Sequence, residues 1–261
     1  MAVRTKALIR SSYKQTVLKD GPIAYWRLGE ASGTRASSEV SGNAGTYTGG
    51  YTLAQTGALA AEPDGTSNTA VLLNGTTGYV TVPDGMKLAS TMTIEAWIKT
   101  SSSATDNAIA CHFGTPSYTG WLFEVGGVTA GKLSMYVGVG GWTETVLSVN
   151  DGAWHHVAAT VTGGIVRLYI DGALAATSGS ITTTLTLATT HPLEIARRFD
   201  GTPAFFNGTI DDVALYATAL PVARILAHYT AGLNQAKGDV ATARTVAVSR
   251  GGLATARTKV A

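Results

Sequence analysis

The segment DGAWHHVAATVTGGIVRLYIDGALAA, residues 151–176, constrains the fold most strongly, because it contains two predicted β-hairpins in direct succession. Three apolar, β-branched runs are separated first by Gly163-Gly164 and then by Asp171-Gly172. Two-residue links of these types suit turns with positive φ, whose twist matches that of antiparallel strands. The segment therefore predicts an antiparallel meander with at least one buried face. Its expected strands are residues 155–162, 165–170 and 173–176.

Similar short apolar runs recur along the chain, with turn residues roughly every 8–12 positions. In MTIEAWIKT, residues 92–100, the apolar residues at even positions share one face of an expected strand. Residues 37–50, SSEVSGNAGTYTGG, are expected to form a loop. This spacing is typical of a sandwich rather than of βαβ units. The predicted fold is all-β: an antiparallel two-sheet jelly-roll sandwich with one short C-terminal helix and extended N- and C-terminal arms.

The one predicted helix covers residues 220–231. Pro221 suits its first turn, and Gly232 suits its C-terminal cap. Apolar side chains recur there at i, i+3, i+4 and i+7, so the helix should pack one apolar face against the sandwich. The residues of this expected face are Val222, Ile225, Leu226 and Tyr229.

Charge divides the chain into three parts, although its net charge is only +2. Residues 1–19 hold five basic residues and no acid, and residues 237–261 hold five basic residues and one acid, so the body between them is acidic. The last segment repeats the string ATART and has no aromatic residue, so it cannot close a core of its own. The predicted units are a basic N-terminal arm (1–19), a jelly-roll domain (20–234) and a basic, low-complexity C-terminal arm (235–261).

Several classes of protein and site are disfavoured by the sequence. One cysteine, Cys111, excludes an internal disulfide framework, and no apolar run is long enough to suggest a membrane span or a secretory signal. The pairs His155-His156 and Cys111-His112 are expected to pack rather than to bind metal or catalyse, because neighbours on a strand point to opposite faces.

Six segments of the body occur in an order typical of a known family. They are AYWRLGE, SGNAGTYTG, GYVTVPDG, MTIEAWIKT, DGAWHHVAAT with RLYIDGALAA, and NGTIDDVALYATALPVARILAHYTAG. On these segments the body resembles a LamG-like jelly roll of the concanavalin A-like lectin and glucanase superfamily over roughly residues 22–233. The chain opens with basic residues followed by AYWRLGE, and in this it also resembles proteins encoded among bacteriophage structural components.

An enzyme is not expected. The resemblance implies that a glucan-cleaving member would carry two glutamates around an aspartate on one strand, and the chain has no such run. Its nearest acids, Asp211 and Asp212, are adjacent and should point to opposite faces of a strand, so they cannot form a catalytic pair. Glu95 and Glu124 stand alone in the sequence.

Calcium is the cofactor that the resemblance suggests, because domains of this family often hold one Ca²⁺ near a sandwich edge. The positions similar to its ligands are Asn43, Asp211 and Asp212, although Glu39 stands where relatives often have Asp. The alternative is that Asp211 or Asp212 anchors a turn through backbone N–H groups.

Carbohydrate binding would need exposed aromatic side chains near a loop rim. The equally open alternative is that these residues pack in the core. The candidates are Tyr47, Tyr51, Tyr118, Trp121 and Trp142.

The first functional hypothesis is a non-enzymatic virion component, a capsid decoration or tail protein assembled in the host cytoplasm, whose arms dock onto acidic surfaces of neighbouring subunits or copies of itself. The acidic body disfavours nucleic acid as the partner of the arms. The second hypothesis is a lectin-like module for a host-surface glycan. The expected arm residues are Arg4, Lys6, Arg10, Lys14, Arg244, Arg250, Arg257 and Lys259.

Overall fold

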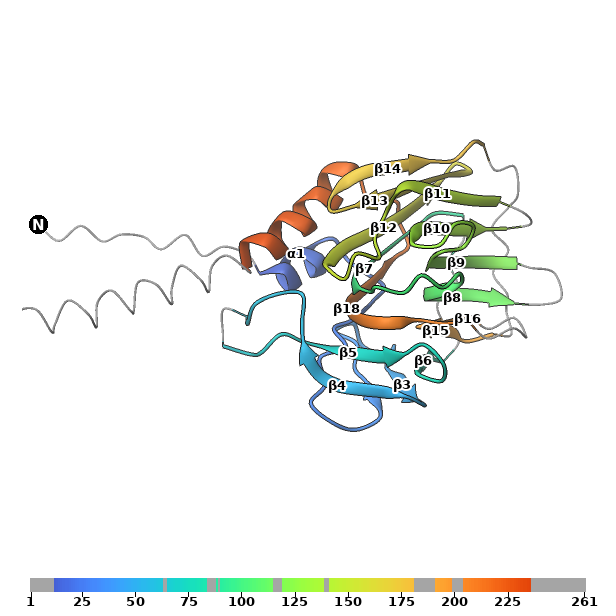
Figure 1. Cartoon of the computed structure of the whole chain (residues 1–261). Helices are drawn as coiled ribbons and strands as arrows, with labels where there is room; N and C mark the ends of the chain where they lie inside the picture. The colour runs from blue at the N-terminus through green and yellow to red at the C-terminus, as the bar shows by residue number, and fades with distance from the viewer. Residues whose placement is uncertain are drawn as a thin grey trace, which may run out of the picture.

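Two antiparallel β-sheets stack face to face in this protein, and two helices lie on the outer side of one of them (Figure 1). The structure is a computed structural model. It describes residues 12–62, 65–83, 88, 90–114, 119–138, 141–180, 191–198 and 204–235.

The helices are α1 (Tyr13–Lys19) and the C-terminal helix (residues 222–235). In chain order the strands are β1 (Ala24–Trp26), β2 (Arg35–Ala36), β3 (Gly45–Thr48), β4 (Tyr51–Thr56), β5 (Thr69–Asn74), β6 (Tyr79–Val82), β7 (Met92–Lys99), β8 (Asn107–Gly114), β9 (Thr119–Val125), β10 (Lys132–Val137), β11 (Gly141–Ser148), β12 (Trp154–Thr162), β13 (Ile165–Ile170), β14 (Ala173–Thr177), β15 (Leu193–Ile195), β16 (Arg197–Arg198), β17 (Ala204–Phe205) and β18 (Asn207–Tyr216).

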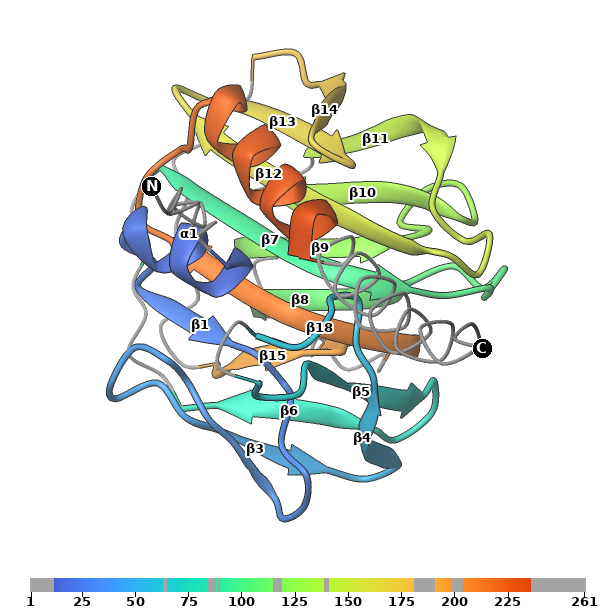
Figure 2. The ribbon, with the colours of Figure 1, turned by 90° about the vertical axis from the view of Figure 1, so that its left-hand side faces the viewer.

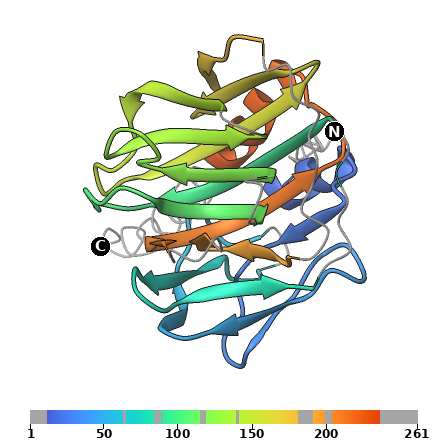
Figure 3. The same ribbon diagram turned by 90° about the vertical axis from the view of Figure 1, so that its right-hand side faces the viewer.

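Sheet A has the order β14-β13-β12-β7-β18-β5-β4, with β1 paired to β18. Sheet B has the order β11-β10-β9-β8-β15-β6-β3-β2. Figure 3 shows the molecule with sheet B facing the viewer. The predicted double hairpin is confirmed as β12, β13 and β14. Both residues of its Asp-Gly turn have positive φ, 52° at Asp171 and 78° at Gly172, as such a turn requires.

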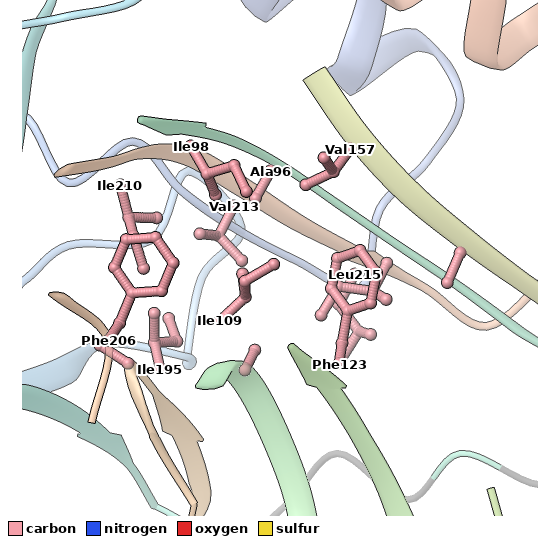
Figure 4. Close-up of a cluster of buried hydrophobic side chains, with 14 of the residues drawn as sticks. Ala96, Ile98, Ile109, Phe123, Val157, Ile195, Phe206, Ile210, Val213 and Leu215 are labelled. Carbon is pink, nitrogen blue, oxygen red and sulfur yellow. The ribbon is translucent and has the colours of Figure 1, made fainter. Parts of the chain in front are cut away.

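The main core lies between the two sheets. The even-numbered residues of β7 face this core as the alternation predicts, and they meet side chains from β18, β12 and β9 (Figure 4). Ile98, Phe123 and Leu215, one from each of three strands, are at most 1% exposed. This burial of apolar surface between the sheets supplies most of the driving force for the sandwich.

The outer face of sheet A is buried as well, because α1 and the C-terminal helix lie across it (Figure 2). Tyr13 and Val17 of α1 and Ile225 of the C-terminal helix pack there against Trp97 and Tyr216 of the sheet. This second apolar layer explains why β7 is buried at every position from 92 to 98.

The C-terminal helix differs from its prediction in both extent and orientation. It runs from residue 222 to residue 235, and Val222 and Leu226 are half exposed. Gly232 is not a cap but an interior residue, where a Cβ atom would lie 2.6 Å from Cζ2 of Trp97. A glycine is therefore needed for close approach of the helix to the sheet. The residues that face the sheet are Ile225, His228, Tyr229 and Gly232.

The predicted N-terminal arm is too long. Its last seven residues form α1, which begins with a capping box between Ser12 and Gln15. Lys14, expected to contact a neighbouring subunit, lies 2.6 Å from Oε1 of Glu39 in the same chain. The expected loop at residues 37–50 contains β3. Predictions that fall outside the described residues concern Arg4, Lys6, Arg10, Tyr118, Arg244, Arg250, Arg257 and Lys259.

Neither of the two described helices is long and apolar enough to cross a membrane.

Candidate functional site

The predicted sugar-binding aromatics divide into buried and accessible residues. Tyr47 and Trp121 belong to the core between the sheets, so they cannot stack on a ligand from solvent. Tyr51 is partly buried and stacks on Tyr47, with 5.0 Å between ring centroids. Trp142 is 38% exposed, so it is the described candidate that solvent reaches best.

Trp142 lies on the outer face of sheet B, on the edge strand β11. Strand register pairs it with Tyr136 of β10, and the two rings meet edge to face with centroids 5.2 Å apart and planes at 63°. Phe113 of β8 contacts the other side of Tyr136, with 5.5 Å between centroids. These contacts fix the orientation of the indole, which stays partly exposed to solvent.

A row of polar residues runs beside this aromatic row. Register aligns Glu124 of β9, Ser134 of β10 and Glu144 of β11, two positions along each strand from the aromatic row. The backbone N–H of Thr129 donates to Oε2 of Glu144 over 2.6 Å, and Nζ of Lys132 lies 3.9 Å from its Oε1. Glu144 is thus held in one orientation beside the indole.

Gly127 sits beneath the indole. A Cβ atom at this position would lie 2.3 Å from Cζ3 of Trp142 and 2.6 Å from Oε1 of Glu124. Such distances are too short, so any side chain here would displace the indole or the carboxylate. We call the set Tyr136, Trp142, Glu124, Glu144 and Lys132 the Trp142 platform.

A second polar group is buried at Asp211 and Asp212 on β18. The prediction that these side chains point to opposite faces is wrong, because a β-bulge interrupts the pairing of β18 with β7 and Asp212 has a φ of 52°. Both carboxyl groups consequently turn to one region beside residues 57–68, where both are fully buried.

The two aspartates differ in their partners. The carboxylate of Asp212 accepts hydrogen bonds from the hydroxyl of Tyr25 and from the side-chain amide of Asn68. Its Oδ1 lies 3.4 Å from Nε of Arg27. Asp211 accepts a hydrogen bond from the backbone N–H of Ala58 over 2.9 Å. Burial and the adjacent charge of Asp212 raise the pKa of Asp211 well above its usual value.

The three predicted calcium ligands do not converge. Asn43 donates to the carbonyl of Ile23, and among the described residues no hydrogen bond joins it to either aspartate. Oδ1 of Asp211 accepts no hydrogen bond from the described residues, so it is one available donor, whereas Ca²⁺ takes six to eight oxygens. The described residues also contain no cluster of three or more His, Cys, Asp or Glu suited to a metal.

A third polar group centres on Glu95, which the sequence left without a partner. Glu95 is fully buried on the outer face of β7, and the hydroxyl of Tyr216 donates to it over 2.5 Å. Nε2 of His156 lies 3.1 Å away, and Nδ1 of His228 lies 2.9 Å away. Nε2 of His228 is 2.8 Å from Asp20 at the end of α1.

Within this network, Glu95 and His228 each stabilise the charged form of the other. Burial alone would raise the pKa of Glu95, but the charge of His228 and hydrogen bonds from both histidines hold it well below its usual range. Burial alone would lower the pKa of His228, yet Glu95 and Asp20 raise it. The network therefore joins both helices to sheet A, and with all its central groups buried it offers no ligand site.

Comparison with protein families gives one match. Residues 74–226 match the family described as the concanavalin A-like lectin/glucanases superfamily. The chain belongs to this superfamily. The predicted resemblance to this superfamily is thereby confirmed, and its jelly roll is the sandwich described above. A comparison with curated protein sequences gave no match.

Solved structures of similar fold include domain 4 of AbnA, an extracellular arabinanase from Geobacillus stearothermophilus, in complex with arabinotriose. It is 20% identical, with a TM-score of 0.56, and the match covers 80% of this chain and 98% of that one. A Trypanosoma rangeli sialidase in complex with 2,3-difluorosialic acid is 15% identical, with a TM-score of 0.57, over 82% of this chain and 33% of that one. The binding domain of a botulinum neurotoxin in complex with SialylT is 12% identical, with a TM-score of 0.53, over 82% and 52%. These likenesses show the sandwich fold.

Proposed function

We propose that this protein binds carbohydrate through the Trp142 platform. The observation that carries the proposal is an accessible indole fixed by Tyr136 beside a carboxylate that is itself fixed by a backbone N–H. A pyranose ring has an apolar face that can stack on an indole and hydroxyls that can donate to a carboxylate.

The structural relatives support the same role. The arabinanase domain, of which the match covers 98%, was solved with arabinotriose, and the neurotoxin binding domain was solved with SialylT. The Asp211–Asp212 pair is fully buried and cannot touch a substrate, so binding rather than hydrolysis is the role proposed for this body.

The test is a glycan array followed by titration calorimetry of the best ligand. Replacing Trp142 with Ala removes the stacking surface and should weaken binding about 30-fold, equivalent to about 2 kcal/mol for a central aromatic contact. Leu147→Ala is the matched control, because Leu147 is an exposed apolar residue of the same strand outside the platform. Equal affinity of the two variants would exclude the platform as the binding site.

A second candidate function is a structural role in an assembly such as a virion, with the basic terminal segments docking onto acidic subunits. The specific observation is that the backbone N–H of Tyr13 donates to Oε1 of Gln235 over 2.9 Å, so the two ends of the described body adjoin on the helical side of sheet A. Deleting residues 236–261 should abolish incorporation into the assembly, and unchanged incorporation would contradict this role.

A further inference from the structure

We infer that the Trp142 platform selects neutral sugars over acidic ones and takes a single sugar ring of a soluble glycan. The inference rests on the proposed carbohydrate binding and adds the chemical class of the ligand. The charges beside the indole and the angle between the two aromatic rings support this selectivity. The expected ligand thus differs from the difluorosialic acid and the SialylT bound by two structural relatives.

The platform has more acidic than basic groups. Glu144 and Glu124 lie on either side of Ser134 in the row next to the indole. The one basic side chain of the platform, Lys132, lies 3.9 Å from Glu144, so its charge is largely offset. Two arginines that follow β15 of sheet B are engaged elsewhere, with Arg197 2.7 Å from Glu194 and Arg198 2.6 Å from Asp106.

A ligand carboxylate or sulfate stacked on Trp142 would therefore approach Glu144, and Lys132, the one basic side chain of the platform, is already paired with that glutamate. Like charges at a half-buried position repel each other more strongly than in bulk water, because the surrounding dielectric is lower. Neutral hydroxyls instead donate to the carboxylate of Glu144, and such charge-assisted hydrogen bonds are strong. The platform should thus discriminate against acidic sugars by at least about tenfold.

Ring geometry limits how many sugars stack. The planes of Trp142 and Tyr136 meet at 63°, and Tyr136 is partly buried, so the two rings do not form one flat surface. A flat crystalline polysaccharide would need coplanar rings spaced along a face. One indole face accommodates one sugar, which favours a soluble glycan chain or a chain end.

The experiment uses the full chain on a glycan array that carries each glycan in matched neutral, sialylated and sulfated forms. Titration calorimetry then compares the best neutral glycan with its sialylated counterpart. The neutral form should bind at least about tenfold more tightly, and its affinity should change less than about twofold between about 50 mM and about 500 mM NaCl, because no ion pair forms. Microcrystalline cellulose should not retain the protein.

Two variants test the origin of the selectivity. Glu144→Gln should narrow the ratio of neutral to sialylated affinity to about threefold or less, whereas Lys132→Ala should widen it. Glu39→Gln, an acid outside the platform, should leave the ratio unchanged, and thermal unfolding confirms that each variant is folded. Preference for the sialylated form, lost in Trp142→Ala, would overturn this inference but keep the proposed function. Absence of binding to every glycan would overturn both.

Discussion

Replacing Glu95 with Gln is the sharpest test of how the helices are held on sheet A. The substitution keeps the volume of the side chain but removes the charge between His156 and His228 and turns an amide NH₂ group toward hydroxyl and imidazole donors. Removing one partner from a buried, hydrogen-bonded ion pair costs about 3–5 kcal/mol, because the remaining charge stays buried without compensation. The free energy of unfolding should fall by that amount.

Urea unfolding followed by tryptophan fluorescence measures this loss. With a slope of about 3 kcal/mol per molar urea for a domain of this size, the midpoint should fall by about 1–1.7 M. Glu39→Gln is the control, because its ion pair with Lys14 is partly exposed and worth at most about 1 kcal/mol. A loss below about 1 kcal/mol for Glu95→Gln would show that the network is not a main support of the helices.

Three further predictions concern single residues. The pKa of His228 is raised in the folded protein, so protonated His228 stabilises the fold fully below about pH 6.5, and this stabilisation is lost as the pH rises through the folded-state pKa. The urea midpoint of the wild type should therefore fall between about pH 6 and about pH 9. The midpoint of His228→Asn should fall less over the same range. Asp211→Asn mimics the protonated acid and should change the unfolding free energy by less than about 1 kcal/mol. Calcium should not raise the melting temperature of the wild type or of this variant. A calcium-dependent rise confined to the wild type would instead support the calcium site. Gly232→Ala should destabilise by about 1–3 kcal/mol through overpacking against Trp97, whereas Gly179→Ala, with open space around it, should be neutral in the same melting assay.

Sequence patterns predicted the sandwich because its strands depend on local signals. Alternation in β7 and the Gly-Gly and Asp-Gly links of the double hairpin are set by neighbouring residues, and both are as expected in the structure. The helix α1 escaped prediction because seven residues with two buried side chains, Tyr13 and Val17, give no repeating pattern.

The polar clusters could not be predicted in the same way. Glu95 meets His156, Tyr216 and His228 across 61, 121 and 133 residues of sequence, and no local pattern links them. The orientation of Asp211 and Asp212 was predicted wrongly because strict alternation fails at a β-bulge.

The candidate site was predicted in part. Trp142 was one of five aromatic candidates for which the sequence left rim and core open, and its exposure became known only from the structure. Its partner Tyr136 and the carboxylate of Glu144 were missed, because they come together only through the register of β10 with β11. Trp121 alternates with Phe123 and Val125 along β9, and this pattern could have marked it as a core residue.

The hydrogen bond between Tyr13 and Gln235 also bears on how the body can be used as a building block. Because the two ends of the folded unit adjoin, the body can be inserted into a surface loop of a host protein as a cassette, entering and leaving at one point without stretching the host backbone. The Trp142 platform would then face away from the host, because it lies on the side of the sandwich opposite the helices (Figure 1). Such an insertion gives a ready route to displaying the domain in many copies on a scaffold of known geometry.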